Sequence, residues 1–178
     1  MVYATHISFA NAIGLVPVIV LACNDMVLKR ELIAAYAAAL TIGAVIPDID
    51  EPNSHIGKKF TGISEIVNHF FGHRGITHYF IVPAILFALL SIYTPKSPIL
   101  FVSFFGFALG YFLHIIGDSM TVGGIPRAFY PISKQTFWLL PERFRFYTNQ
   151  TAEFCIILPI TSIVEFVEWY FIVQFYFI

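Results

Sequence analysis

The stretch from Ile99 to Asp118 reads ILFVSFFGFALGYFLHIIGD and contains no Lys, Arg, Asp or Glu before its last residue. A helix needs about 20 such residues to cross a bilayer, so this run is typical of a transmembrane span. Its two most polar members, His114 and Asp118, lie four positions apart, which places both on one face of a helix. The run therefore predicts a membrane helix that carries two potential ligands at one end.

The rest of the chain has the same apolar character. Hydrophobic residues make up 58% of its 178 residues and charged residues only 12%, and the mean hydropathy is +0.78. Soluble domains contain about 25% charged residues. We therefore expect an all-α, polytopic membrane helix bundle of about five spans, forming a single membrane-embedded domain over residues 1–178. The expected apolar segments are Ile7–Cys23, Leu32–Ile46, Tyr79–Tyr93, Ile99–Ile116 and Phe154–Ile178. The second and third are short, which leaves four spans as an alternative. We expect the first to be retained, since it lacks a clear signal-peptide pattern.

Two short and two long connections join these segments. Asn24–Glu31 and Thr94–Pro98 are short, whereas Pro47–His78 and Gly117–Glu153 are long. In the first long connection apolar residues recur at helical spacing, which predicts an amphipathic helix lying on the membrane; they are Phe60, Ile63, Ile66, Val67 and Phe70. The second is rich in aromatic residues, which favour the headgroup level or contact with a lipid substrate.

The charges of the connections predict the orientation. With five spans, both long connections share one side, which holds seven cationic residues: Lys58, Lys59, Arg74, Arg127, Lys134, Arg143 and Arg145. The other side holds Lys29, Arg30 and Lys96. The positive-inside rule places the long connections in the cytoplasm. The net charge of −1 and the absence of a basic tract argue against a nucleic-acid partner. Cys23 and Cys155 match no zinc or redox motif.

Histidines and acidic residues gather at the side of the long connections. Eight lie at span ends there and are candidate metal ligands: His6, Asp48, Asp50, His73, His78, His114, Asp118 and Glu153. His6 lies just before the first span and has helix capping as an alternative role. Asp48 and Asp50 have turn formation as an alternative. An ionisable residue at membrane depth points to function, because burying it in lipid is costly.

The ligand types indicate the metal and the chemistry. Imidazole and carboxylate without thiolate suit Zn, with Mn or Fe as alternatives. Eight candidates exceed one tetrahedral site, so we expect one or two ions, with an aspartate bridging them if there are two. Two-metal sites commonly serve phosphoester hydrolysis. Arg74 is expected to hold a phosphate oxygen or, alternatively, to pair with an acidic residue. Asp50 or Glu153 is the candidate general base.

Two further glutamates lie well along the last span. Glu165 and Glu168 are about 18 Å or more from Glu153 along a helix, too far to join the cluster. They are expected to pair with Lys29 or Arg30, or to face a partner subunit.

Three motifs carry a family resemblance. They are Pro47-Asp48-Ile49-Asp50-x-Pro52-Asn53-Ser54, His73-Arg74-Gly75-Ile76-Thr77-His78, and Gly110-Tyr111-x-x-His114-x-x-x-Asp118 followed by Thr121 and Gly124-Ile125. Together they resemble the YdjM-type family, described as LexA-regulated, membrane-bound, metal-dependent hydrolases. The resemblance extends from Thr5-His6 to Glu153 and implies a bacterial inner-membrane protein. A more distant similarity to zinc phospholipase C and P1-type nucleases implies phosphoester hydrolysis, although the chain lacks their full set of histidines.

The expected function is therefore a membrane-bound, metal-dependent hydrolase of a phospholipid or another lipid phosphate, with Asp50, Arg74 and Glu153 as the catalytic candidates. The alternatives are a divalent-cation binding or transport protein, and a structural metal site. The substrate, the metal and the oligomeric state are left open.

Overall fold

The computed structural model describes residues 1–93 and 96–178. Four helical segments within them are long and apolar enough to cross a membrane. They are α1 (Tyr3–Gly14) with α2 (Val16–Cys23), α3 (Arg30–Gly43) with the 3-10 helix η1 (Ile46–Asp50), α7 (Pro98–Ser119), and the π-helical turn η4 (Glu153–Ile157) with α8 (Leu158–Tyr176). A fifth apolar helix, α6 (Ile81–Ile92), is shorter. The all-α membrane bundle expected from the sequence is confirmed.

Two of the expected segments differ in length from the helices. The second is not short, because α3 begins at Arg30 and η1 continues it to Asp50. The third is short, since α6 has 12 residues and rises about 18 Å, against a hydrocarbon core of about 30 Å. With α6 included, the helices account for the five expected segments. Part of the expected Thr94–Pro98 connection, residues 94–95, lies outside the described residues.

The closest packing in the bundle joins α3 and α7. A Cβ atom on Gly110 would lie 2.0 Å from the Leu40 carbonyl oxygen, and one on Gly43 would lie 2.1 Å from the Phe107 carbonyl oxygen. Gly106 and Gly110 form the small-xxx-small spacing that lets membrane helices approach closely. This spacing is visible in the sequence as Gly106-x-x-x-Gly110. It brings the His114 face of α7 against the end of α3.

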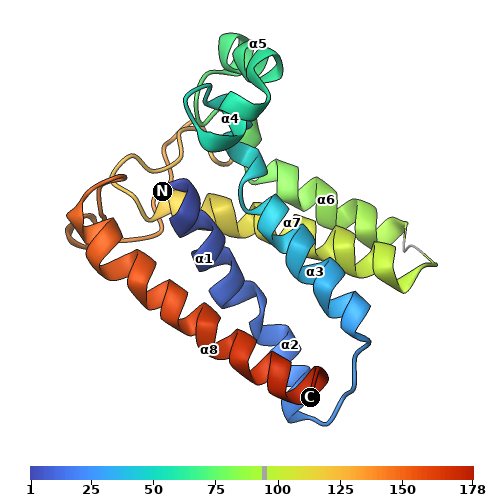
Figure 1. The fold of residues 1–178 in the computed structure, drawn as a ribbon. Helices are drawn as coiled ribbons and strands as arrows, with labels where there is room; N and C mark the ends of the chain where they lie inside the picture. Colours follow the sequence, from blue (N-terminus) through green and yellow to red (C-terminus); the bar gives the residue numbers. More distant parts are fainter. Residues whose placement is uncertain (94–95) are drawn as a thin grey trace.

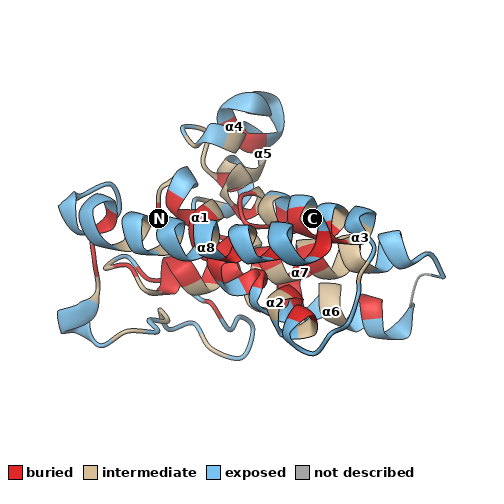
Figure 2. Ribbon diagram, turned by 60° about the horizontal axis from the view of Figure 1, so that its bottom comes forward, coloured by how far each residue is buried: buried red, intermediate tan, exposed pale blue. Residues whose placement is uncertain are grey.

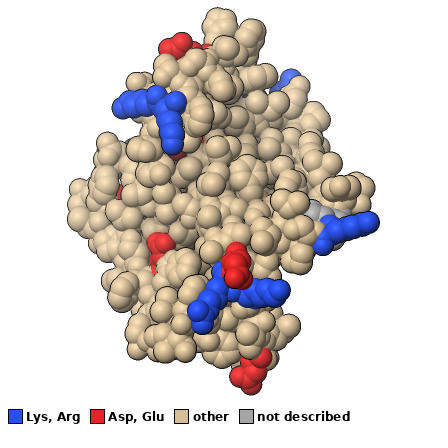
Figure 3. Space-filling view, turned by 45° about the vertical axis from the view of Figure 1, so that its right-hand side comes forward, with Lys and Arg blue, Asp and Glu red and all other residues tan. Residues whose placement is uncertain are grey.

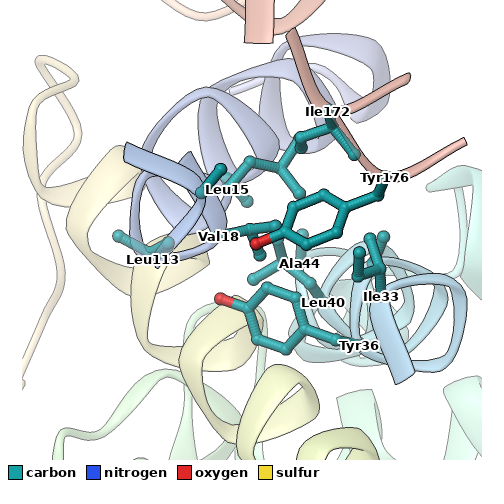
Figure 4. Packing of buried hydrophobic residues seen from close by; sticks show 12 residues of the cluster. Leu15, Val18, Ile33, Tyr36, Leu40, Ala44, Leu113, Ile172 and Tyr176 are labelled. Atoms are coloured by element: carbon teal, nitrogen blue, oxygen red, sulfur yellow. The ribbon is translucent and has the colours of Figure 1, made fainter. Parts of the chain in front are cut away.

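Apolar side chains from several helices meet in the core. Figure 4 shows side chains such as Leu15, Leu40 and Ile172 converging, and these three are completely buried. The outside of the bundle is also apolar. Most of α8 is exposed in Figure 2, and its exposed residues include Ile163, Phe166 and Phe171. Most of the face in Figure 3 is free of Lys, Arg, Asp and Glu. Because the exposed faces are apolar, the bundle suits a lipid environment.

The first span is broken near its middle. It was predicted as one segment, Ile7–Cys23, but α1 already begins at Tyr3 and a break at Leu15 separates it from α2. Pro17 has no amide hydrogen to continue the hydrogen-bond ladder of α1, and proline is favoured in the first turn of a new helix. The earlier start places His6 inside α1, where its side chain is buried, and not before the span as predicted.

Polar side chains link the first and last spans beside this break. Asn11 Nδ2 donates a hydrogen bond to Glu165 Oε1 at 2.7 Å, and Thr41 Oγ1 donates to Asn11 Oδ1 at 3.2 Å. The predicted pairing of Glu165 with Lys29 or Arg30 was wrong, because Asn11 on the adjacent helix reaches this carboxylate. Arg30 Nε instead donates to the carbonyl oxygen of Tyr176 at 2.7 Å.

Both long connections lie at the end of the bundle where α1 begins (Figure 1). The first contains α4 (His55–Lys59), α5 (Thr61–Phe71) and the 3-10 helix η2 (Ile76–His78). The predicted helix around Phe60–Phe70 is therefore present as α5. The second is mostly turns, with one 3-10 helix, η3 (Glu142–Phe144). The two connections enclose the end of the bundle that carries the candidate ligands.

Candidate metal centre

Four elements bring candidate ligands together at this end of the bundle. His6 lies in α1, Asp48 and Asp50 in η1, His78 in η2, and His114 with Asp118 in α7. Five of these six side chains are buried, and Asp48 is 17% exposed. His114 and Asp118 face the same way because one helical turn separates them. Asp48 and Asp50 are held in the 3-10 turn that extends α3, so they point inward from a helical segment.

Four potential ligand atoms lie near one another and form what we call the four-atom centre: Asp48 Oδ1, His78 Nε2, His114 Nε2 and Asp118 Oδ2. The two Nε2 atoms are 3.2 Å apart. Asp48 Oδ1 lies 3.6 Å from His114 Nε2 and 3.9 Å from His78 Nε2, and Asp118 Oδ2 lies 3.6 Å from His78 Nε2. Metal–ligand distances of 2.0–2.2 Å in a tetrahedral zinc site place neighbouring ligand atoms about 3.3–3.6 Å apart. The four distances given above, from 3.2 to 3.9 Å, lie close to this spacing.

The hydrogen-bond partners of the two imidazoles fix where their protons lie. His114 Nδ1 is 2.7 Å from the carbonyl oxygen of Ala44, and a carbonyl can only accept, so Nδ1 carries the hydrogen. His78 Nδ1 is 2.9 Å from Asp50 Oδ2, which assigns its hydrogen in the same way. In the neutral rings, both Nε2 atoms then present lone pairs to each other. Two lone pairs at 3.2 Å are unfavourable unless a cation or a proton lies between them.

Asp50 supports the centre from outside. Its Oδ2 also accepts a hydrogen bond from Thr77 Oγ1, and its Oδ1 is 3.1 Å from His73 Nδ1. Asp48, Asp50 and His78 can also be grouped as three potential ligands. However, the hydrogen bonds already made by both Asp50 oxygens match the carboxylate–histidine arrangement that orients a metal-binding imidazole. The structure therefore favours an orienting role for Asp50 over direct ligation.

His6 and Asp118 extend the centre on its other side. The His6 ring stacks on the His114 ring, with centroids 3.7 Å apart, and His6 Nε2 lies 3.2 Å from Asp118 Oδ1. Neither ring nitrogen of His6 has a hydrogen-bond partner of good geometry among the described residues. Burying an imidazole without a hydrogen-bond partner costs free energy unless the ring binds a metal ion or another polar group. His6, Asp48, His114 and Asp118 can each contribute one atom to a group within 4.8 Å.

Arg74 forms an ion pair with one atom of the centre. Its Nε is 2.9 Å from Asp118 Oδ2, and its Nη1 donates to the carbonyl oxygen of Gly124 at 2.8 Å. Its φ of +56° is uncommon for a residue other than glycine, and these contacts hold it there. Of the two roles predicted for Arg74, the structure contains the pairing with an acidic residue.

An open cavity lies beside the centre. It has a volume of about 510 Å³, and Asp48, His73, Arg74 and Asp118 form part of its lining. The His73 side chain is 42% exposed, and its hydrogen bond to Asp50 raises the pKa of His73 above its ordinary value. His73 belongs to neither group of potential ligands. The structure thus places it at the cavity wall, in contact with the group that orients His78.

Glu153 is a second candidate that lies outside these groups. Its Oε1 accepts a hydrogen bond from the Val2 main-chain nitrogen at 2.7 Å, and its Oε2 accepts one from the Asn149 nitrogen at 2.7 Å. Val2 precedes α1, where amide groups lack helical partners. Glu153 therefore joins the start of α1 to the last long connection, and this geometry does not support its predicted roles as ligand and general base.

The family follows from comparison with known proteins. Residues 1–178 match the family described as YdjM inner membrane protein. The chain belongs to the YdjM family. The chain is 40% identical over 93 residues to a protein named YvsG from Bacillus subtilis (strain 168). The match covers 52% of this chain and 56% of YvsG. The inner membrane proteins YdjM of Escherichia coli (strain K12) and Shigella flexneri are each 38% identical over 86 residues, covering 46% of this chain and 42% of each relative.

The matches to these curated relatives thus span about half of each relative's length. No solved structure matches the chain significantly. The resemblance to the YdjM family and the inner-membrane part of the predicted localisation agree with these findings. The relatives' names state no reaction, metal or substrate.

Sequence reasoning missed two supporting residues of this YdjM-family chain. Thr77 donates a hydrogen bond to Asp50, and Tyr111 Oη donates one to the Thr77 carbonyl oxygen at 2.6 Å. Both residues lie within the motifs that carry the family resemblance, between or beside candidate ligands. Their position was a signal, but only the structure shows that they connect α7 to η2.

Proposed function

We propose that this YdjM-family chain is a membrane-bound, metal-dependent hydrolase that acts on a phosphoester at the membrane interface. The observation that carries the proposal is the four-atom centre, in which two imidazoles of fixed tautomer and two carboxylates converge beside an open cavity. A centre that only stapled the loops would be closed, whereas a catalytic one has access to substrate. Asp48 and Asp118 both line the cavity, which favours the catalytic alternative.

The donor set suits a divalent ion, with Zn first and Mn or Fe as alternatives. Asp48, His78, His114 and Asp118 would hold one ion, and His6 is the additional donor for a fifth bond or a second ion. When bound, such an ion lowers the pKa of a water molecule and polarises a phosphoryl oxygen. Residues of this chain prepare the centre: Asp50 orients His78, and Arg74 positions Asp118.

His73 is the best-placed group for proton transfer. Asp50 holds its Nδ1, so Nε2 is the ring nitrogen left to meet a substrate in the cavity. His73 takes the place of the predicted general bases, Asp50 and Glu153. Both oxygens of Asp50 already accept hydrogen bonds, and both oxygens of Glu153 accept hydrogen bonds from main-chain amides.

A lipid phosphate is the proposed substrate class. The centre lies at the end of the bundle where the spans meet the long connections, and exposed aromatic side chains such as Phe129, Tyr130 and Tyr147 lie in the second connection. Such aromatics favour headgroup level, from which a lipid can reach the cavity laterally. We place this end on the cytoplasmic side. Arg74 is ion-paired with Asp118, so it is not counted in the charge difference between the two sides. The side with the long connections then holds six cationic residues, seven minus Arg74, and the other side holds three.

Hydrolysis with and without metal tests the proposed function. Wild-type protein in proteoliposomes of phosphatidylethanolamine and phosphatidylglycerol is expected to release phosphate from phosphatidic acid, or water-soluble headgroup from the bulk lipids. A chelator should abolish release, and added Zn or Mn should restore it, because the reaction depends on the ion. Bis(p-nitrophenyl) phosphate provides a chromogenic probe. Metal-loaded, folded protein without activity on any of these phosphoesters would contradict the proposal.

Asp50→Asn is expected to weaken metal binding by about 10–100-fold while preserving the fold, because it removes the negative charge and one of the two acceptor oxygens of the carboxylate that orients His78. Metal affinity can be measured by competition with a chromophoric chelator in detergent solution. Glu51→Gln is the matched control, since Glu51 Oε2 is 3.7 Å from His73 and Glu51 belongs to neither ligand group. Equal affinities for the two variants would show that Asp50 does not orient a ligand.

Cation transport is a second candidate, favoured by the polar groups inside the membrane. The break between α1 and α2 and the Asn11–Glu165 hydrogen bond resemble the broken helices and midplane polar groups of transporters. Glu168 is only 9% exposed, and its Oε2 has no hydrogen-bond partner among the described residues. Uptake of Mn or Zn into proteoliposomes containing a metal-sensitive dye would favour transport, whereas hydrolysis without uptake favours the enzyme.

A further inference from the structure

Helix α5 turns polar residues inward and exposes apolar residues, which is the reverse of the arrangement usual in soluble proteins. Its inward residues are polar: Ser64 is completely buried, and Asn68 Nδ2 donates a hydrogen bond to the Asp50 carbonyl oxygen at 2.7 Å. Its outward residues are apolar, with Ile63, Ile66 and Phe70 exposed by 55%, 61% and 71%. Surface helices of soluble proteins bury their apolar stripe. The apolar stripe of α5 therefore needs a partner other than the bundle.

The remaining side of α5 is polar and exposed. Successive residues of a helix are rotated by about 100°, so Ile63, Ile66 and Phe70 form one narrow stripe. Thr61 and Glu65, both exposed, lie on nearly the opposite side of the helix from this stripe. The helix thus has three sides: one bonded to the site, one apolar and one polar. This division is what a helix lying at a boundary between lipid and water requires.

The surroundings of α5 identify lipid as the partner. Figure 1 shows α4 and α5 standing out to the side of the bundle, near the end where α1 begins, and not in line with its helices. The next membrane helix, α6, also exposes apolar residues, including Ile81 and Ile85. Lys58 and Lys59 are the last residues of α4, separated from α5 by Phe60 alone. Both are exposed, and their charge complements the negative headgroups of an anionic leaflet.

We propose that the stripe Ile63, Ile66 and Phe70 docks into the surface of an anionic bilayer, with Lys58 and Lys59 at the headgroups. This interaction surface goes beyond the proposed hydrolase function and does not depend on it. Because Asn68 is bonded to the Asp50 main chain, docking also braces the segment whose carboxylate orients His78. The membrane surface then becomes part of the support of the metal centre.

Site-specific fluorescence can test the docking. In a Cys23→Ser/Cys155→Ser background, Ile66→Cys and Glu65→Cys are each labelled with an environment-sensitive fluorophore. The full chain is reconstituted into vesicles of phosphatidylethanolamine and phosphatidylglycerol that contain spin-labelled lipid. We expect the label on Ile66→Cys to be quenched several-fold more by spin-labelled lipid than the label on Glu65→Cys. We expect aqueous iodide to show the opposite preference. Both positions are exposed, so neither label requires repacking.

Two outcomes would overturn the proposal. Equal iodide quenching of both labels would show that the stripe faces water. Shielding of the Ile66→Cys label from both quenchers would show that protein, such as a second copy of this chain, covers the stripe. A Lys58→Gln/Lys59→Gln variant tests the charge component: it should reduce lipid quenching in vesicles with phosphatidylglycerol and leave it unchanged in phosphatidylcholine alone. An unchanged signal in the anionic vesicles would remove anionic lipid from the proposal.

Discussion

His114→Ala is expected to lower the metal content of the purified protein from near one equivalent or more to background. The reason is that His114 Nε2 is one of the atoms of the four-atom centre, 3.2 Å from His78 Nε2 and 3.6 Å from Asp48 Oδ1. Loss of a group that merely orients a ligand weakens metal binding by 10–100-fold, so we expect loss of a ligand to exceed about 100-fold. Elemental analysis after gentle purification measures the effect.

A second substitution at this position separates ligation from folding. The His114 ring also stacks on His6 and donates to the Ala44 carbonyl oxygen, so alanine removes structural contacts as well. His114→Asn can keep a donor near the position of Nδ1 while lacking Nε2, and it should fold and still lose the metal. His69→Ala is the matched control, because His69 is exposed on α5 and outside both ligand groups.

The stoichiometry of the wild type bears on the two ligand groups. One equivalent corresponds to the four-atom centre alone. Two equivalents would indicate a second ion, with His6 as its additional donor. Metal retained at the wild-type level in both His114 variants would contradict the centre. The buried histidines and carboxylates would then constitute a polar network or a proton path.

Gly110→Ala is expected to destabilise the protein by about 3 kcal/mol or more, lowering the midpoint of thermal unfolding in detergent by roughly 6 °C or more. Its new methyl group would lie 2.0 Å from the Leu40 carbonyl oxygen and 2.9 Å from the Ala44 nitrogen. Both are main-chain atoms, which cannot move aside without separating α3 from α7. Since Ala44 also accepts the hydrogen bond of His114, we expect metal binding to weaken as well.

Gly62→Ala provides the matched control for this effect. A Cβ atom there meets nothing within 4 Å, and alanine favours helix over glycine by about 1 kcal/mol. The same chemical change should therefore leave stability unchanged or raise it slightly. If the two variants unfolded at the same temperature, close α3–α7 packing would not be the feature that holds the centre together.

The sequence by itself determined the class of fold and the gathering of the candidate ligands. Apolar runs must form helices in a bilayer, because only helices satisfy their own main-chain hydrogen bonds there. Successive spans cross the membrane in opposite directions. Once the apolar runs are counted, this places His6, Asp48, His78 and Asp118 at one end of the bundle, however the helices pack. Hydropathy and span counting therefore predicted the layer in which the centre lies without any knowledge of side-chain direction.

Only the tertiary structure decided what each polar residue does within that layer. Asp48 and Asp50 are two positions apart, yet one faces the centre and the other orients His78, because η1 turns them in different directions. Arg74 meets Asp118, and Glu153 meets main-chain amides at the start of α1, through contacts between segments far apart in the chain. Sequence spacing fixes the level of a side chain along a span. The direction and the partners of the side chain decide whether it is a metal ligand or supports one. Both depend on how the helices pack against each other.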